Sequence, residues 1–379
     1  MELMFPLFDE AEIENLRACL NSRWVTQGPF VDQFEHLVAE RHAVKYAMAT
    51  TSCTAALHLA ALALDLGPGD EVIVPAFTWI TSANCAEYTG AKAVFVDVDR
   101  NTFNIDVHQL EAAINSKTRA IIAVHLFGLA AEMDKINALA RKHNLYVIED
   151  AACAIGTTYN NQPVGGLGDA GCFSFHPRKA VTTGEGGMVT TNNLELADIV
   201  RSLRNHGSTG VPESEQPRGP WTMATFNRLG YNLRLSDIQA AVGVAQMAKL
   251  DRLLTERRNA AFHYSELLKE IDEVASPTAV VDCSGHSFQS YVIRLKQGGR
   301  DKRNAIMQVF SDHNISTRPG THAVTTLGYY VNKYGIKPGS FPVAEECQDT
   351  TITLPVFPGI SPEQQHEVIA CLKKALHKA

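Results

Sequence analysis

The chain has 379 residues, of which 45% are hydrophobic and 20% are charged, and its formal net charge is −7. This length exceeds what one hydrophobic core usually organises and favours two domains of unequal size, while the composition excludes a disordered or fibrous protein. The negative net charge gives no general affinity for nucleic acid or for an anionic membrane, so we expect neither as a partner.

The N-terminal segment, residues 1–16, carries acidic residues where a secretory signal needs basic ones. No stretch reaches the roughly 18 consecutive apolar residues that a membrane helix requires. The chain contains no CxxC pair, and its cysteines are scattered at positions 19, 53, 85, 153, 172, 283, 347 and 371. This spacing favours reduced thiols over disulfides or a zinc site, so we expect a cytoplasmic protein without a metal.

The next segment alternates between helical and strand-like patterns. Residues 55–66 favour a helix, with Thr51 as its N-cap and Gly67 as its end. Six short apolar runs then predict strands at 71–75, 93–98, 120–125, 145–150, 172–175 and 187–191. Runs rich in Val, Ile and Ala that alternate with helices indicate a largely parallel sheet covered on both faces.

Such a sheet binds its ligands beyond the carboxyl ends of its strands. Polar residues that end a predicted strand, such as His125 and Asp150, are therefore candidate site residues.

The second half of the chain predicts a long loop and a long helix. Residues 207–226 are rich in Gly, Pro and Ser, and loops of this length are often lids or contact surfaces. Residues 246–271 form one amphipathic pattern that we interpret as a helix leading into a smaller α+β domain. We expect a large domain over residues 1–250 and a small domain over 251–379.

Gly166, Gly168 and Gly171 match the G-x-G-x-x-G pattern of dinucleotide-binding proteins. That motif needs a strand before it and a helix after it, whereas here a polar loop precedes it and the apolar run 172–175 follows. A turn-rich hairpin is the better interpretation, so NAD is excluded as the cofactor.

Lys179 and Asp150 together suggest a different cofactor, pyridoxal 5′-phosphate (PLP). Lys179 lies between an apolar run and a glycine-rich turn, and Asp150 ends a predicted strand. A PLP enzyme needs a lysine amine that binds the cofactor covalently and moves a proton, and a carboxylate that keeps the pyridine nitrogen protonated. Taken singly, Lys179 also fits a solvated surface charge and Asp150 a helix cap.

Nearly the whole chain resembles the DegT/DnrJ/EryC1/StrS family of sugar aminotransferases, within the aspartate aminotransferase superfamily of fold type I. The matching stretches, in family order, are WVTQGPFVDQFE, TSCTAALHLAAL, GDEVIVPAFTW, VFVDVD, VHLFG, EDAACAIG, SFHPRKAVTTGEGGM, RNHG and GYNLRLSDIQAA. The resemblance implies an α/β fold with a mostly parallel sheet in the large domain and a smaller C-terminal α+β domain.

The resemblance also implies roles for individual residues. Lys179 corresponds to the lysine that carries the cofactor, Asp150 to the partner of the pyridine nitrogen, and Trp79 to the aromatic residue that stacks on the ring. The residues that correspond to phosphate contacts are Cys53, Thr54 and Ser174. A plain core tryptophan and a backbone-bonded strand serine remain open alternatives for Trp79 and Ser174.

Asn232 resembles the residue that reaches the phosphate bound by a neighbouring subunit, which implies a homodimer with shared active sites. A turn-forming asparagine is the alternative at this position.

The chain departs from the family pattern at three positions. Cys53 stands where glycine or alanine is common, and its backbone N–H is still available to a phosphate. Cys153 stands where Gln, His or Glu usually lies near the phenolic oxygen of the cofactor, and a thiol is a weaker hydrogen-bond partner. Ile155 replaces a frequent histidine. Lys179 itself is retained, which disfavours the dehydratase branch of the family, where histidine takes its place.

Basic residues are candidates for the substrate pocket, because guanidinium groups suit the phosphates of a nucleotide. These candidates are His176, Arg204, His206, Arg228, Arg318 and His322. The function we expect is the transfer of an amino group, with glutamate as the expected donor, onto a nucleotide-linked keto-sugar. The alternatives are another fold type I PLP reaction, such as that of an amino-acid aminotransferase or a sugar dehydratase, or a non-catalytic regulator on the same scaffold.

Overall fold

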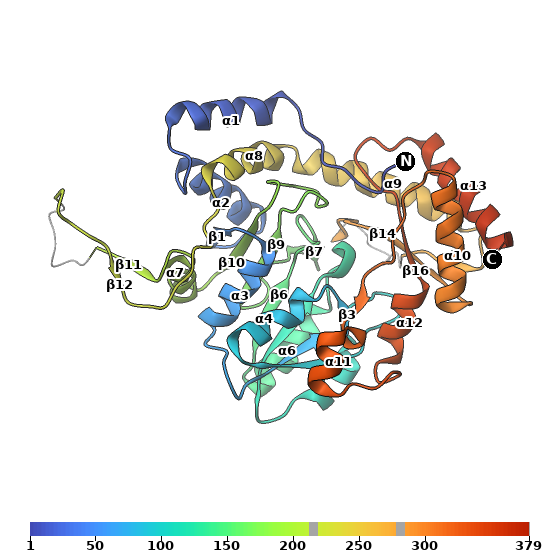
Figure 1. Cartoon of the computed structure of the whole chain (residues 1–379), viewed down its shortest axis with the longest axis horizontal. Helices are drawn as coiled ribbons and strands as arrows, with labels where there is room; N and C mark the ends of the chain where they lie inside the picture. The colour runs from blue at the N-terminus through green and yellow to red at the C-terminus, as the bar shows by residue number, and fades with distance from the viewer. Residues whose placement is uncertain (212–218, 278–284, 379) are drawn as a thin grey trace.

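A computed structural model describes residues 1–211, 219–277 and 285–378. Within these ranges the largest element is a seven-stranded sheet (Figure 1). Its strands, in spatial order, are β1 (Tyr46–Thr50), β10 (Gly187–Thr191), β9 (Ala170–Ser174), β6 (Tyr146–Asp150), β5 (Thr118–Val124), β2 (Glu71–Pro75) and β4 (Lys92–Val96). β10 runs antiparallel to both of its neighbours, and the remaining pairs are parallel. The predicted, largely parallel sheet is confirmed.

Both faces of this sheet are buried, because alternate residues of each strand enter different hydrophobic clusters. In β2, Val72 and Val74 pack on one side and Ile73 on the other. The helices that cover one face are α3 (Cys53–Ala63), α4 (Thr81–Thr89) and α7 (Leu194–Leu203). Those that cover the other are α2 (Pro29–Arg41), α6 (Met133–His143) and α8 (Asp237–Ala248), with the short α5 (Val107–Leu110) beside α6 and α1 (Glu10–Ser22) packed on α8.

The start of α3 differs from the sequence prediction. Ser52, not Thr51, is the N-cap, and its side chain accepts a hydrogen bond from the Ala55 N–H. The Thr51 N–H instead bonds to the Leu233 carbonyl. The helix ends at Ala63, before the predicted end at Gly67. Strand β1, which ends just before the N-cap of α3, was not among the predicted strands.

The single helix predicted over 246–271 is also wrong in detail, because two helices meet at Lys249. α8 ends at Ala248, and α9 runs over Leu250–Leu268. The ammonium group of Lys249 forms salt bridges with Asp9 and Glu12. The junction is thus anchored to the N-terminal segment.

The C-terminal part contains a three-stranded antiparallel sheet of β13 (Val274–Ala275), β14 (Tyr291–Leu295) and β16 (Thr351–Leu354). It packs against α9, α10 (Gly299–Asp312) and α13 (Pro362–Lys378). The N-terminal residues join this part, since the Leu3 carbonyl accepts the Val356 N–H. We propose the start of α9 as the boundary between the large and small domains. The N-terminal residues before α1 pack with the small domain.

The contacts that hold the small domain over the carboxyl ends of the central strands include a strand pair and a helix cap. Strand β15 (His322–Ala323) pairs with β3 (Phe77–Thr78). Asp97, which follows β4, accepts the N–H groups of Val343 and Ala344 at the start of α12 (Pro342–Thr350), beside the short α11 (Gly328–Tyr334).

The described residues of the loop predicted over 207–226 belong to an arm that extends away from the body of the chain (Figure 1). Its described residues include β11 (Ser208–Gly210) paired with β12 (Thr225–Phe226), and residues 212–218 lie outside the described ranges. A second hairpin, β7 (Thr158–Tyr159) with β8 (Gln162–Pro163), precedes the glycine-rich segment. None of the helices in the described ranges combines the length and apolar character needed to cross a membrane.

Candidate active site

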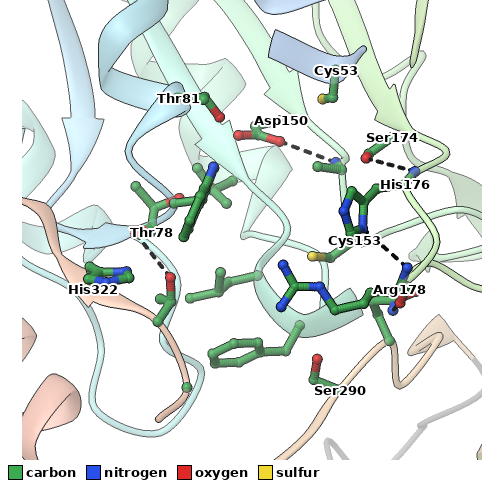
Figure 2. Close-up of a pocket in the computed structure, with 18 of the residues that line it drawn as sticks. Cys53, Thr78, Thr81, Asp150, Cys153, Ser174, His176, Arg178, Ser290 and His322 are labelled. Carbon is green, nitrogen blue, oxygen red and sulfur yellow. Dashed lines mark hydrogen bonds between the residues drawn. The ribbon is translucent and has the colours of Figure 1, made fainter. Parts of the chain in front are cut away.

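A cavity of about 900 Å³ lies between the carboxyl ends of the central strands and the small domain (Figure 2). His125 after β5, Asp150 at the end of β6 and Ser174 at the end of β9 line it from the large domain. The small domain contributes the segment 318–322, among others. A cavity beyond strand ends is where an open α/β sheet binds ligands.

The carboxylate of Asp150 is held by neighbours on two sides. Ser82 donates a hydrogen bond of 2.6 Å to Oδ2, and the Ala152 N–H donates to Oδ1. The Ser82 hydroxyl is itself 2.9 Å from that of Thr78. Asp150 is 5% exposed, and in Figure 2 it lies at the same end of the pocket as Cys53 and Thr81. The strand end therefore presents a fixed, buried acceptor to the cavity.

Lys179 lies in the turn that follows β9. Its backbone N–H bonds to the His176 carbonyl at 2.8 Å, and its Nζ donates to the Sγ of Cys153 at 3.2 Å. Lys179, Cys153 and Asp150 all line the same cavity. A primary amine and a carboxylate therefore face one space large enough for a cofactor and a substrate.

The N-terminus of α3 forms the wall beside Asp150. Ser52 caps the helix, and helical geometry leaves the N–H groups of Cys53 and Thr54 without intrahelical acceptors. Such N–H groups, at the positive end of a helix, suit a phosphate. The Cys53 thiol itself points to the Cys172 carbonyl, and burial followed by the charge of Asp150 raises its pKa well above the usual value.

His322 lies on the opposite side of the cavity from Ser174 and His176 (Figure 2). Trp79, which follows β3, lies beside His322 because β3 pairs with β15. Their rings are 5.6 Å apart in an edge-on arrangement. Trp79 is 55% exposed, so it is not a core residue within this chain. The sequence alternative of a plain core tryptophan is therefore disfavoured.

Arg318 is an incompletely bonded cation in the cavity wall. Its Nε atom is buried and has no hydrogen-bond partner among the described residues. Burial, followed by the charge of Arg178, lowers its pKa. A buried donor without an acceptor is costly, so this group fits an anionic ligand such as a carboxylate or a phosphate.

Of the other basic candidates, His176 also lines the cavity, and burial lowers its pKa. Arg204 is wrong as a pocket residue: it is buried elsewhere and bonds to Glu35 and to the Ala49 carbonyl. His206, Arg228 and Asn232 are not among the residues that line this chain's cavity, and both Arg228 and Asn232 are exposed.

The glycine-rich segment 165–168 has a structural explanation. Its N–H groups at Gly165, Leu167 and Gly168 each donate, over 2.7 Å, to the buried carboxylate of Glu149. Burial alone would raise the pKa of Glu149, but these bonds and that from His125 outweigh it and lower the pKa. The segment therefore binds a carboxylate of the protein itself and leads into β9.

Sequence reasoning missed two residues that support the site. Ser82 lies behind Asp150, and Gln289 approaches the Lys179 turn from more than a hundred residues further along the chain. The signal for Gln289 in the sequence was a polar residue two positions before the apolar strand 291–295.

The donor set of the cavity fits PLP. It combines an amine, a buried carboxylate, N–H groups at a helix end that lack intrahelical acceptors, and a guanidinium nitrogen without a partner in the described part of the chain. These are the groups that an aldehyde, a ring nitrogen and the anionic groups of cofactor and substrate require.

Comparison with known proteins agrees with this geometry. Residues 6–373 match the model of the DegT/DnrJ/EryC1/StrS aminotransferase family. The chain is 38% identical to the spore coat polysaccharide biosynthesis protein SpsC of Bacillus subtilis, over 97% of this chain and 95% of that protein. It is also 38% identical to GDP-perosamine synthase of Caulobacter vibrioides, over 98% and 97%.

Among solved structures, it is similar to Spr1654 of Streptococcus pneumoniae, a candidate sugar aminotransferase. The TM-score is 0.95 for the PMP form, at 28% identity and with 100% and 99% of the two chains covered, and 0.92 for the PLP form.

Proposed function

Because the chain belongs to the DegT/DnrJ/EryC1/StrS aminotransferase family, we propose that it transfers an amino group from glutamate to a keto group of a nucleotide-linked sugar. It is a PLP-dependent aminotransferase. The observation that carries the proposal is the placement of Lys179 and Asp150 in one cavity with Arg318. Similarity to relatives named for polysaccharide and perosamine synthesis supports the sugar as acceptor.

PLP, when bound, supplies an electron-accepting ring that stabilises negative charge at the carbon that carries the amine. In this proposal Lys179 binds the cofactor covalently and, when free, moves a proton to or from that carbon. Asp150, whose carboxylate is held by Ser82, would accept a hydrogen bond from the ring nitrogen and keep it protonated. The N-terminus of α3 and Ser174 would hold the phosphate, Trp79 would hold the face of the ring, and Cys153 would lie on the side of the cofactor oxygen.

Arg318 binds the carboxylate of the amine donor in this account, since its buried Nε lacks a partner among the described residues. His322, beside Trp79, contacts the sugar substrate. An arginine that holds an α-carboxylate is also expected of an amino-acid aminotransferase, so the two reactions differ in the second substrate and must be separated by experiment.

The active sites are shared between two subunits in this proposal. Asn232 lies at the base of the arm and outside its own chain's cavity, where it is available to a partner's phosphate. Arg228 is placed similarly. The arm exposes large apolar side chains, with Trp221 at 79% and Leu229 at 89%, and such side chains favour a protein interface.

We also place the enzyme in the cytoplasm. The seven described cysteines are free thiols, which suits a reducing compartment.

The direct test uses protein loaded with glutamate and freed of excess donor. Addition of GDP-, UDP- and dTDP-linked keto-sugars should yield an amino sugar for at least one of them, measured by mass spectrometry, with 2-oxoglutarate as the co-product of loading. Transfer to 2-oxo acids alone would favour an amino-acid aminotransferase. Absence of loading by any amine donor would favour a regulator.

A further inference from the structure

Gln289 contacts the backbone on both sides of Lys179. Its side-chain Oε1 accepts the Ala180 N–H at 3.0 Å, and its Nε2 donates to the Arg178 carbonyl. Those two groups belong to the two peptide units that flank the Lys179 Cα. Together with the bond from the Lys179 N–H to His176, they fix the direction in which the lysine side chain leaves the backbone.

Gln289 is itself held rigidly. It is 3% exposed, lines the cavity and lies two residues before the start of β14 in the small domain. Its neighbours bond to the large domain, since the Ser287 and Ser290 N–H groups donate to the carbonyls of Gly128 and Phe127. Phe288 between them adopts a left-handed backbone with φ of 46°, a conformation that is unfavourable for a residue with a side chain.

The same segment reaches the thiol that faces the lysine. The Ser287 hydroxyl donates to the Cys153 carbonyl at 3.1 Å, and the Cys153 thiol accepts from the Lys179 amine. Residues 287–290 of the small domain therefore hold both the lysine turn and the thiol beside its amine.

We propose that Gln289 is a positioning residue that fixes the backbone of Lys179 so that its amine meets the cofactor. This inference rests on the proposed role of Lys179. Only a neutral amide of this length donates to one peptide group and accepts from the other. A methionine of similar size does neither. A carboxylate would place an acceptor oxygen where the Nε2 donor now lies and would repel the Arg178 carbonyl. Reactions between bound groups are sensitive to small displacements, so loss of this clamp should slow covalent attachment.

The experiment separates attachment from binding. Pyridoxamine phosphate occupies such a pocket without a covalent bond to lysine, whereas PLP must react with it. Gln289→Met apoprotein should attach added PLP about tenfold more slowly or worse, followed by the visible absorbance band, while its Kd for pyridoxamine phosphate stays within about twofold. Exchange of the Ala180 amide hydrogen, followed by mass spectrometry, should accelerate in the holoprotein.

Gln365→Met is the matched control, because Gln365 is a buried small-domain glutamine that donates to the Ala260 carbonyl away from the cavity. It should leave the ratio of attachment rate to affinity unchanged. Gln289→Glu provides a second measurement if Gln289→Met does not fold. Protonation of that glutamate restores a donor, so its attachment rate relative to the wild type should rise as the pH falls from 8 to 6.

Wild-type attachment in Gln289→Met, or wild-type attachment at pH 8 in Gln289→Glu, would overturn the proposal. Equal losses of PLP attachment and pyridoxamine phosphate affinity would do so as well, because they indicate a residue that merely shapes the pocket. Failure of the wild type to attach PLP at Lys179 would instead overturn the proposed function.

Discussion

The amine of Lys179 donates a hydrogen bond to the thiol of Cys153 over 3.2 Å. Among the described cysteines, Cys153 is half-buried and the others are buried. The thiol therefore reports on whatever occupies the space around the lysine.

Iodoacetamide should alkylate Cys153 in the apoprotein, and PLP should slow that reaction about tenfold or more by filling the cavity. Cys85 is a suitable internal comparison, because burial and then the charge of Asp150 raise its pKa to about 12. Mass spectrometry of the Cys153 peptide measures the rate. Equal rates with and without the cofactor would place Cys153 away from it.

Asp150→Asn should lower turnover by roughly 100-fold or more while the protein still folds and binds the cofactor, because a neutral amide no longer keeps the pyridine nitrogen protonated. Asp198→Asn, at an exposed residue of α7 paired with Arg201, is the control and should be silent. Near-normal turnover in Asp150→Asn would make the residue a structural acceptor for Ser82 and the Ala152 N–H.

Glu149→Gln should lower the free energy of unfolding by about 2–4 kcal/mol at pH 7, because an amide cannot accept all the bonds that the buried carboxylate accepts. The folded state lowers the pKa of Glu149 from 4.5, so the unfolded chain takes up the proton first as the pH falls. The stabilisation of the folded state by the Glu149 carboxylate is fully present above pH 4.5 and is lost as the pH falls through the pKa of Glu149 in the folded protein. Urea titrations at pH 7 and pH 4 should show the gap between wild type and variant narrowing, and Glu132→Gln, at an exposed residue, should show no gap.

A mixture of Lys179→Ala and Asn232→Ala subunits, each inactive alone, should regain activity after subunit exchange. If the two residues of one site come from different chains, a mixed dimer has one intact site, and random equal mixing gives about a quarter of wild-type activity. Full activity of Asn232→Ala alone would make Asn232 a turn former. No recovery despite verified exchange would assign it to its own chain's cofactor.

The sequence predicted most of the large sheet, because buried parallel strands appear as runs of Val, Ile and Ala, and it located Asp150 because that residue ends such a run. It did not reveal the break at Lys249, because the apolar pattern continues across it and the partners of Lys249 there, Asp9 and Glu12, are distant along the chain. Ser82 and Gln289 were missed for a similar reason: each acts through a partner that is distant along the chain, and neither belongs to a local motif. The sequence pattern also suggested Arg204 as a pocket residue, whereas its ion pair with Glu35 holds its side chain away from the cavity.

The covalent attachment of PLP to Lys179 is the central claim, and borohydride reduction tests it most directly. Purified holoprotein should be yellow, reduction should abolish the visible band, and peptide mass spectrometry should locate the reduced cofactor on Lys179. Location of the cofactor on Lys142 or Lys302, or the absence of any modified lysine in protein that has bound PLP, would contradict the account.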